Sequence, residues 1–432
     1  MSDQPLCRSA RPAADGTNNL CRQSAYPLRL LVLSHLYPTP GIPVMGIFIE
    51  NWVKAMADGC EHISVIAPQA YVPLPLRHLP RYAGYTAPRH EIRAGITIYR
   101  PKYLRPRGSW FISFAPFSMR LAAEPVARRL HAAVAFDFLI AVSLLPDGAA
   151  AIELGRKLDL PVLVNVIGSD MTIVARANHR SELVARHVCR QAELIFCQSD
   201  QLRKQAVSLG ADPQKTIRYC RGLDTGIFQT LPDRCKSREI WGLGPDKNET
   251  LIIFVGNVSR RKGALDLAEA FTRLEDSITS RCRLCFIGKP TEAQAVLKIA
   301  SQRSLADRLE FTGQLEHPEV LRRLKGVDLL VLPSHAEGMP NAVLEAFAAG
   351  VPVVASTVGG LDDLLEKDEP FFPFQAGNVD QLAAQLRRAL LNPDQAREKA
   401  RRAGELVRAE YNVHLKAREL LDWMARRAGK HP

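Results

Sequence analysis

Short apolar runs rich in β-branched residues alternate with helical segments along this chain, and this alternation restricts the possible fold more than any other feature. A first series includes "LRLLVLSH", "HISVIAP", "FDFLIAV" and "PVLVNV". A second series runs from "LIIFVG" through "RLCFIG", "LEFTGQ" and "DLLVLP" to "VPVVAS". Such runs form strands buried on both faces, and helices between them produce a parallel sheet of βαβ units. The sequence therefore predicts two doubly wound α/β halves with a cleft between them.

A polar stretch, "QTLPDRCKSREIWGLGPDKNET", separates the two series. The 432 residues exceed what one hydrophobic core ordinarily fills, so two domains are expected. We predict an N-terminal Rossmann-like domain at residues 27–225 and a C-terminal one at 226–405. Residues 1–26 are polar and without pattern, which predicts a disordered leader.

The sequence indicates a cytoplasmic protein. It has no run of eighteen apolar residues, and its N-terminus lacks the apolar core of a signal peptide. Nine cysteines, an odd number, suit a reducing compartment better than a disulfide framework. Cys282 and Cys285 form a lone C-x-x-C with no second pair nearby, so we interpret them as core residues and not as zinc ligands.

The formal net charge is +12, and residues 77–107 form an uninterrupted basic stretch apart from Glu91. Its cations are Arg77, Arg81, Arg89, Arg93, Arg100, Lys102, Arg105 and Arg107. Aromatic residues lie among them and continue into "SWFISFAPF" from Ser109 to Phe117. This composition suits an anionic lipid surface or an acidic polymer, and equally a solvated face over ordinary core aromatics. Nucleic acid is not expected as a partner, because no nucleic-acid-binding module is recognisable.

Three strand-to-helix junctions carry residues suited to binding an anion. In "PSHAEGMPNAVLEAFAAG", Glu337 lies in the loop and Glu345 within the helix. Pro340 suits the first helical position, and Gly350 provides the stop. Ligands of open α/β sheets bind beside such helix N-termini, whose free N–H groups favour anions. We therefore interpret this stretch as half of an anion site.

The other two junctions are less specific. In "FVGNVSRRKGALDLAEAF", Gly256 ends a strand, and Arg261 and Lys262 precede a helix that is expected to begin near Ala264. These cations suit a diphosphate, although a solvated basic loop has the same composition. In "LSHLYPTPGIPVMGIFIENW", Gly46 would let the backbone approach a ligand just before a helix, and an ordinary βα loop remains the alternative.

Two common phosphate-binding motifs are missing from the sequence. It contains neither G-x-x-x-x-G-K-[ST] nor a G-x-G-x-x-G after a strand. No D-x-D occurs either, so we expect fixed cations and not a metal ion to hold a diphosphate. We therefore expect no metal and no cofactor.

The chain from Leu28 onward resembles the family 4 glycosyltransferases, which are retaining enzymes with the GT-B fold. The family pattern P-S-x-x-E-G-x-P-x-x-x-x-E-A is matched from Pro333 to Ala346 and leads into "VPVVASTVGG". "GNVSRRKG" resembles the family loop G-R-x-x-x-x-K-G, with Asn257 where arginine is usual. The resemblance implies a GT-B fold in which residues 406–432 form a helix returning to the N-terminal domain.

The resemblance also implies roles for individual residues. Glu345 would accept hydrogen bonds from the ribose hydroxyls of a nucleotide, which explains a carboxylate on an otherwise apolar helix. Glu337 would contact the donor sugar, and Lys262 and Arg261 the leaving diphosphate. Other donor-binding positions would be Gly338, Met339, Pro340, Asn341, Ala342, Gly256 and Gly46.

Two positions depart from the family pattern. Many relatives have a histidine before G-x-D, whereas this chain has Ile167 before Gly168 and Asp170. Asp170 then either faces the cleft or caps a helix from Met171. "GKP" from Gly288 stands where relatives often have G-D-G-P, which leaves the base of the nucleotide open.

Three functions remain at this point. The first is transfer of a hexose from a nucleoside diphosphate sugar to a glycan or lipid-linked acceptor at the cytoplasmic membrane face, in polysaccharide or glycolipid synthesis. The second is a nucleotide-sugar epimerase of the same fold. The third is a non-catalytic binder of sugar nucleotide or glycan.

Overall fold

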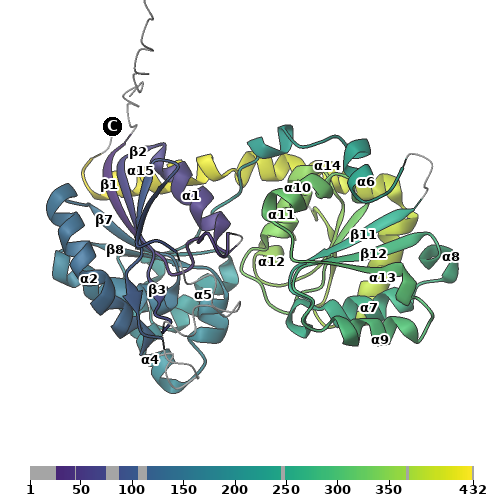
Figure 1. Ribbon diagram of the computed structural model, residues 1–432, viewed down its shortest axis with the longest axis horizontal. Helices are drawn as coiled ribbons and strands as arrows, with labels where there is room; N and C mark the ends of the chain where they lie inside the picture. The colour runs from purple at the N-terminus through teal and green to yellow at the C-terminus, as the bar shows by residue number, and fades with distance from the viewer. Residues whose placement is uncertain are drawn as a thin grey trace, which may run out of the picture.

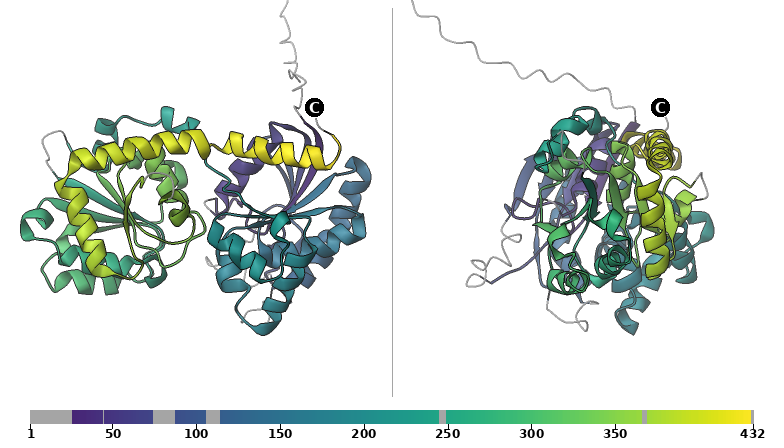
Figure 2. Two further views of the ribbon diagram at one scale, coloured as in Figure 1. Left: turned by 180° about the vertical axis from the view of Figure 1, so that it is seen from behind. Right: turned by 90° about the vertical axis from the view of Figure 1, so that its right-hand side faces the viewer.

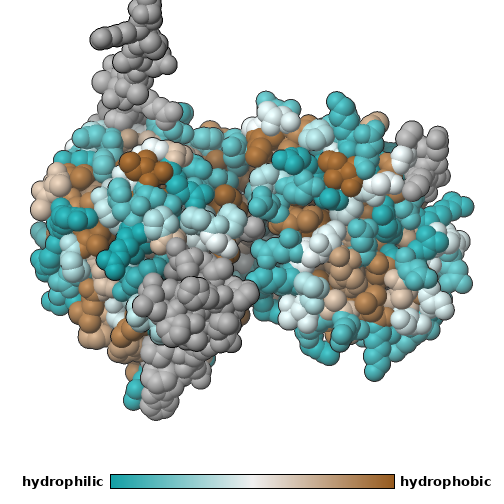
Figure 3. Space-filling model, in the orientation of Figure 1, coloured by the Kyte–Doolittle hydropathy of each residue, from teal (hydrophilic) through white to brown (hydrophobic). Residues whose placement is uncertain are grey.

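The computed structural model describes residues 26–43, 45–73, 87–105, 114–244, 249–365 and 369–430. Two domains lie side by side, and each is a β-sheet with helices on both faces (Figure 1). Figure 3 shows the indentation between the two domains from the same side. The expected pair of α/β halves is therefore confirmed.

The N-terminal sheet is parallel except at one edge. Its strands lie in the order β10 (Thr216–Arg218), β9 (Leu194–Cys197), β8 (Val162–Val166), β7 (Phe138–Ala141), β1 (Tyr26–Leu33), β2 (Cys60–Ile66), β5 (Ile96–Tyr99) and β4 (His90–Arg93). Only β4 among them is antiparallel, and it forms a hairpin with β5. Two short strands, β3 (Gln69–Ala70) and β6 (Lys102–Tyr103), pair separately.

Helices cover both faces of this sheet. They are α1 (Ile47–Ala57), α2 (Ala115–Val134), α3 (Ala149–Leu158), α4 (His179–Gln191) and α5 (Asp200–Ser208), with single turns η4 (Leu144–Gly148), η5 (Asp170–Val174), η6 (Pro213–Lys215) and η7 (Gly226–Gln229). The near-continuous apolar strands bury side chains on both faces, so the domain has one core cluster on each side.

The C-terminal sheet is entirely parallel. Its strand order is β13 (Leu309–Gly313), β12 (Cys282–Ile287), β11 (Thr250–Val255), β14 (Leu329–Leu332), β15 (Val353–Ser356) and β16 (Phe372–Phe374). The helices are α6 (Arg234–Ile240), α7 (Ala264–Thr272), α8 (Asp276–Thr279), α9 (Ala293–Ser301), α10 (His317–Leu324), α11 (Asn341–Ala349), α12 (Gly360–Leu365), α13 (Val379–Leu391) and α14 (Pro393–Glu410), with turns η8 (Arg260–Lys262) and η9 (Ala306–Arg308). Cys282 and Cys285 are buried free thiols, as the core interpretation required.

The C-terminal helix returns to the N-terminal domain, as the resemblance implied. Figure 2 shows α14 and then α15 (Val413–Arg427) crossing from one domain to the other. The helix α15 packs against α1 and β1. There the hydroxyl of Tyr26 donates a hydrogen bond of 2.6 Å to Asp422. Helix α14 ends at Glu410 and α15 begins at Val413, so the connection between them lies within residues 406–432.

The two segments that connect the domains are hydrogen-bonded to each other. The N–H of Leu223 donates to the carbonyl of Tyr411 at 2.8 Å, and the N–H of Val413 donates to the carbonyl of Leu223 at 2.9 Å. Gly222 has φ +75°, and a Cβ there would lie 2.4 Å from the Tyr411 oxygen. Only glycine fits this position, because both the conformation and the close approach exclude a side chain.

The basic stretch is less uniform than its sequence suggests. Residues 1–25 of the expected leader, together with Arg77, Arg81, Arg107, Trp110 and Phe111, lie outside the described residues. Arg100 is a correction: it is buried, pairs with Glu91 and donates to the carbonyl of Pro38 at 2.8 Å. Arg93 pairs with Glu50 of α1. Arg93 and Arg100, which we had assigned to a basic surface, therefore form ion pairs within the protein that stabilise the β4–β5 edge of the sheet.

None of the helices that the structure describes has the length and apolar character required to cross a membrane.

Candidate active site

The loop between β14 and α11 presents unpaired backbone donors. Helix α11 begins at Asn341, and Pro340 precedes it with φ −76° and ψ 114°, so Pro340 is the N-cap and not the first helical residue as we expected. Gly350 ends the helix with φ +74°, as predicted. The N–H groups of Gly338, Met339, Asn341 and Ala342 donate to no residue that the structure describes. Free donors of this kind at a helix N-terminus can bind an anion.

Lys262 and Glu337 meet beside this loop. The Lys262 Nζ lies 2.5 Å from Oε1 of Glu337, and the two side chains are 19% and 10% exposed. Their loops follow β11 and β14, which are neighbours in the sheet. Gly263, at φ +72°, allows the approach, because a Cβ there would lie 1.9 Å from the carbonyl oxygen of Pro333. Gly256 adjoins the Lys262 stem, with its Cβ position 3.8 Å from Cδ.

Arg261 is the free cation of the same loop. Its side chain is exposed and reaches the carbonyl of Ala336 only weakly, at 3.4 Å. Its own carbonyl accepts a hydrogen bond from the N–H of His335 at 3.0 Å. The neighbouring Arg260 is instead paired with Glu292. Among the described residues no carboxylate neutralises Arg261, so it can approach a bound phosphate.

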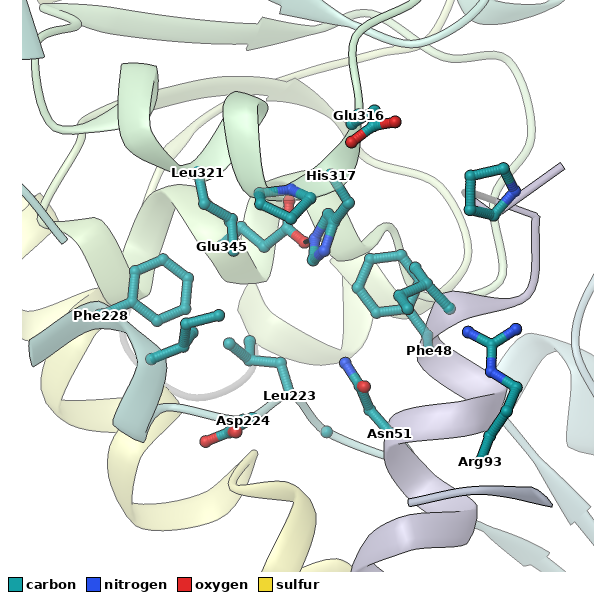
Figure 4. Close-up of a pocket in the computed structure, with 15 residues that line it drawn as sticks. Phe48, Asn51, Arg93, Leu223, Asp224, Phe228, Glu316, His317, Leu321 and Glu345 are labelled. Carbon is teal, nitrogen blue, oxygen red and sulfur yellow. Dashed lines mark hydrogen bonds and ion pairs between the residues drawn. The ribbon is translucent and has the colours of Figure 1, made fainter. Parts of the chain in front are cut away.

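Glu345 lies in an interdomain cavity of about 320 Å³, shown in Figure 4. Its carboxylate is buried and has a partner, because Nε2 of His317 lies 2.6 Å from Oε1. The sequence pattern did not indicate this partner. His317 begins helix α10, 28 residues before Glu345. The pair forms the C-terminal domain's wall of the cavity.

The N-terminal domain supplies the opposite wall through α1. The ring of Phe48 meets the ring of His317 edge-on at 5.2 Å between centroids. Asn51 and Arg93 line the same cavity. Gly46 is the N-cap of α1 at φ +78°, and a Cβ there would lie 1.8 Å from the Leu36 oxygen. This glycine therefore lets α1 begin close to the β1 loop, which places Phe48 at the cavity.

The domains also touch where the family histidine is replaced. A Cβ on Gly338 would lie 2.3 Å from the carbonyl oxygen of Ile167, so the two loops are in direct backbone contact. Asp170 lies beneath the loop that contains Ile167 and Gly168. It accepts hydrogen bonds from the backbone N–H groups of Leu144 at 2.6 Å and Gly168 at 2.7 Å. Burial raises the pKa of Asp170, and these donors oppose the shift. Asp170 is 3% exposed, so it supports the loop and does not face the cleft.

Sequence reasoning missed His317 and Phe48. His317 lies outside the three junctions, whereas Phe48 lies within the quoted junction "LSHLYPTPGIPVMGIFIENW", where only Gly46 was named. The sequence "QLEHPEV" did contain a histidine at a helix start directly after a strand, which is the one signal that could have suggested it. Within the described residues no cluster of three or more His, Cys, Asp or Glu could hold a metal ion.

Comparison with known proteins identifies the family. The sequence profile described as "Glycosyl transferases group 1" matches residues 236–407, and that described as "Glycosyl transferase 4-like domain" matches residues 45–220. The chain is a group 1 glycosyltransferase. This group 1 enzyme is 27% identical over 344 residues to TuaC of Bacillus subtilis (strain 168), a glycosyltransferase assigned to teichuronic acid biosynthesis. The match covers 79% of this chain and 84% of TuaC, whereas several other relatives are matched over about half of their length or less.

Solved structures of low identity share the glycosyltransferase's fold. Sucrose-phosphate synthase from Thermosynechococcus elongatus has a TM-score of 0.75 at 18% identity, covering 93% of this chain and 99% of the other. HepE of Anabaena in complex with UDP-glucose has a TM-score of 0.68 at 15% identity, covering 92% and 100%. The GT-B fold of this glycosyltransferase is thus confirmed. Family membership also sets aside the epimerase and the non-catalytic binder.

Proposed function

We propose that this glycosyltransferase transfers a hexosyl group from a nucleoside diphosphate sugar to an acceptor hydroxyl with retention of configuration. The observation that carries the proposal is the contact of Lys262 with Glu337 beside the free N–H groups of the β14–α11 loop. Cation, carboxylate and helix N-terminus together suit a sugar joined to a diphosphate. Glu345, which lines the interdomain cavity, would hold the ribose hydroxyls.

The reaction breaks the bond between the anomeric carbon and the diphosphate oxygen. A new bond to the acceptor oxygen forms on the same face of the sugar, and the acceptor proton passes to the departing phosphate. Negative charge grows on the leaving group, where Lys262, Arg261 and the N-terminus of α11 would stabilise it. Glu337 would exchange its contact with Lys262 for hydroxyls of the sugar when the donor binds.

The names of similar proteins suggest the donor and the process. HepE binds UDP-glucose, so UDP-sugars are the first donors to test. TuaC is assigned to teichuronic acid synthesis, which supports an acceptor in cell-surface polysaccharide or glycolipid assembly. Fixed cations take the place of a metal in this proposal, so activity in excess EDTA would support it and complete loss would contradict it.

An exposed apolar group at the start of α2 supports a membrane-side location. Leu104, Phe114, Phe117 and Leu121 are 56%, 39%, 52% and 49% exposed. The guanidinium of Arg120 lies 5.4 Å from the Phe117 ring and pairs with Glu124, so the exposed Arg105 is the cation closest in sequence that remains for a lipid headgroup. Apolar side chains beside cations suit shallow insertion into an anionic leaflet. We therefore propose that the enzyme acts at the cytoplasmic face of the membrane, close to a lipid-linked acceptor.

The experiment that tests the proposed reaction uses purified protein with UDP-glucose and other UDP-, GDP- and ADP-sugars. A lipid-linked or glycan acceptor is added, and nucleotide release and the anomeric configuration of the product are followed by NMR. Acceptor-dependent release with a retained anomer is expected. Release of no nucleotide from any donor, or an inverted product, would contradict the proposal.

A further inference from the structure

A histidine and a buried carboxylate meet at one edge of the N-terminal sheet, outside the donor site described above. Nδ1 of His35 lies 2.8 Å from Oδ1 of Asp147, and the backbone N–H of His35 donates to the same oxygen at 3.2 Å. The side chain of Asp147 is fully buried, whereas that of His35 is 15% exposed. The imidazole is therefore anchored on one side and open on the other.

The pair lies at the edge of the sheet that meets the C-terminal domain. His35 follows strand β1, and Asp147 belongs to the turn η4, which follows the adjacent parallel strand β7. The next strand, β8, ends just before Ile167, whose carbonyl oxygen contacts Gly338. Pro43, from the same β1–α1 loop as His35, lines the interdomain cavity. Two strand spacings, roughly 10 Å, therefore separate His35 from the contact between Ile167 and the donor loop.

The carboxylate determines which nitrogen of His35 is available to a ligand. Taking a carboxylate out of water is costly unless donors compensate it, and among the described residues Asp147 accepts only from the two donors of His35. Its other oxygen, Oδ2, is buried without a hydrogen-bond partner. An ionised carboxylate only accepts, so Nδ1 carries the hydrogen and Nε2 keeps a lone pair. No residue that the structure describes donates to Nε2, which can accept a hydrogen bond from a hydroxyl group.

We propose that His35 binds a hydroxyl group of the acceptor and that Asp147 holds the imidazole in place. The inference rests on the proposed function, because it requires an acceptor beside the bound donor. The distance of two strands from the donor loop places the imidazole nearer to a second hydroxyl of the acceptor than to the one that is glycosylated. His35 thus orients the acceptor and takes no part in the proton transfer. A site that accepts from a substrate hydroxyl discriminates against an analogue that lacks it.

The experiment measures glycoside binding by calorimetry while UDP-2-deoxy-2-fluoroglucose, a donor analogue that resists transfer, is in saturating excess. The probes are the octyl β-glycosides of glucose, galactose and N-acetylglucosamine, together with their monodeoxy analogues. The test variant is His35→Asn, whose amide N–H can still donate to Asp147 but which has no atom in the place of Nε2. The control is His187→Asn, which alters an exposed histidine beside Glu153 in the same domain. Melting curves verify that both variants fold.

We expect the Kd of at least one glycoside to rise roughly tenfold in His35→Asn, as for one lost hydrogen bond, and to stay unchanged in His187→Asn. One monodeoxy analogue of that glycoside should bind the native protein about tenfold more weakly than its parent does, whereas His35→Asn should bind the two alike. A purely structural role of His35 would instead weaken parent and analogue equally, and that result would overturn the proposal.

The donor analogue provides a separate readout and should bind the native protein and both variants with the same affinity. If the native protein does not bind it, the proposed function fails and the role of His35 falls with it. If the donor analogue binds but no glycoside does, or if His35→Asn binds every glycoside as well as the control does, only the role of His35 is overturned.

Discussion

The Nζ atom of Lys262 lies 2.5 Å from Oε1 of Glu337, although 75 residues separate them in the chain. The contact exists because β11 and β14 are adjacent and parallel, so the loops at their carboxyl ends meet. A lysine and a carboxylate held together in this way neutralise each other, and under the proposed function a donor with its own negative charge and hydroxyl groups would separate them. The pair is therefore the first target for mutation.

We expect Lys262→Ala to lower kcat strongly while the fold is kept. Removing one fixed cation at the leaving group should raise the barrier by roughly 2–4 kcal/mol. The matched control is Lys298→Ala, an exposed lysine on α9 of the same domain. Initial rates with UDP-sugar and acceptor provide the measurement. A kcat near that of the control would show that Lys262 does not act on the diphosphate.

We expect Glu337→Gln to weaken the binding of a sugar nucleotide while leaving the binding of the free nucleotide nearly unchanged. The variant retains the shape of the side chain but cannot accept from sugar hydroxyls with both oxygens. Affinity for UDP should stay within about twofold, whereas affinity for UDP-glucose should fall roughly tenfold, as for a lost hydrogen bond to a charged group. Titration with both ligands decides the point, and equal losses would refute a sugar-facing role.

Glu345→Gln should weaken UDP itself. One carboxylate oxygen is already engaged by His317, so the amide would leave too few acceptors for two ribose hydroxyls. A rise in Kd of about tenfold is expected. Glu319→Gln on the neighbouring helix α10 is the control, since it changes the same atoms at a residue that pairs with Arg322 and Arg323. An unchanged Kd in Glu345→Gln would show that the nucleoside lies elsewhere.

Asp170→Ala should destabilise the N-terminal domain. Three backbone N–H groups, of Leu144, Ile167 and Gly168, lose their acceptor, and the free energy of unfolding should fall by about 3 kcal/mol. Because burial raises the folded pKa of Asp170 above its ordinary 3.8, its contribution is largest at acid pH and decreases as pH rises through the folded pKa. Denaturant unfolding over that pH range measures both effects. A loss as small as that of the exposed Asp394→Ala would contradict this role.

Phe117→Ser/Leu121→Ser should abolish binding to anionic vesicles. Each exposed apolar side chain that enters the leaflet gains about 1.5–3 kcal/mol, so losing two is decisive. Leu183→Ser/Leu391→Ser removes equally exposed side chains elsewhere. Sedimentation with phosphatidylglycerol vesicles at low and high salt compares the two. Absence of binding by the native protein at low salt would defeat the membrane placement.

The sequence was sufficient to predict most of the strands of both sheets and the junctions after β11 and β14, because buried parallel strands have an unmistakable composition. It was sufficient for β5, which is the run "ITIYRP", but not for β4, where Ile92 is the single apolar residue among polar and charged neighbours such as Glu91 and Arg93. Nor could it show that Arg100 is buried, since burial of a cation depends on Glu91 and on the Pro38 carbonyl from another strand's loop. The partner of Glu345 was hidden for the same reason.

The hydrogen bonds that join Leu223 to Tyr411 and Val413 make the two chain crossings a single mechanical unit. A domain joined to its neighbour by one chain segment can rotate and twist freely. Two connecting segments that are hydrogen-bonded to each other resist such twisting. We therefore expect the domains to move mainly by rotation about an axis near Leu223. Leu223 also lines the interdomain cavity, so we expect this wall of the cavity to change least and the contact between Ile167 and Gly338 to open first.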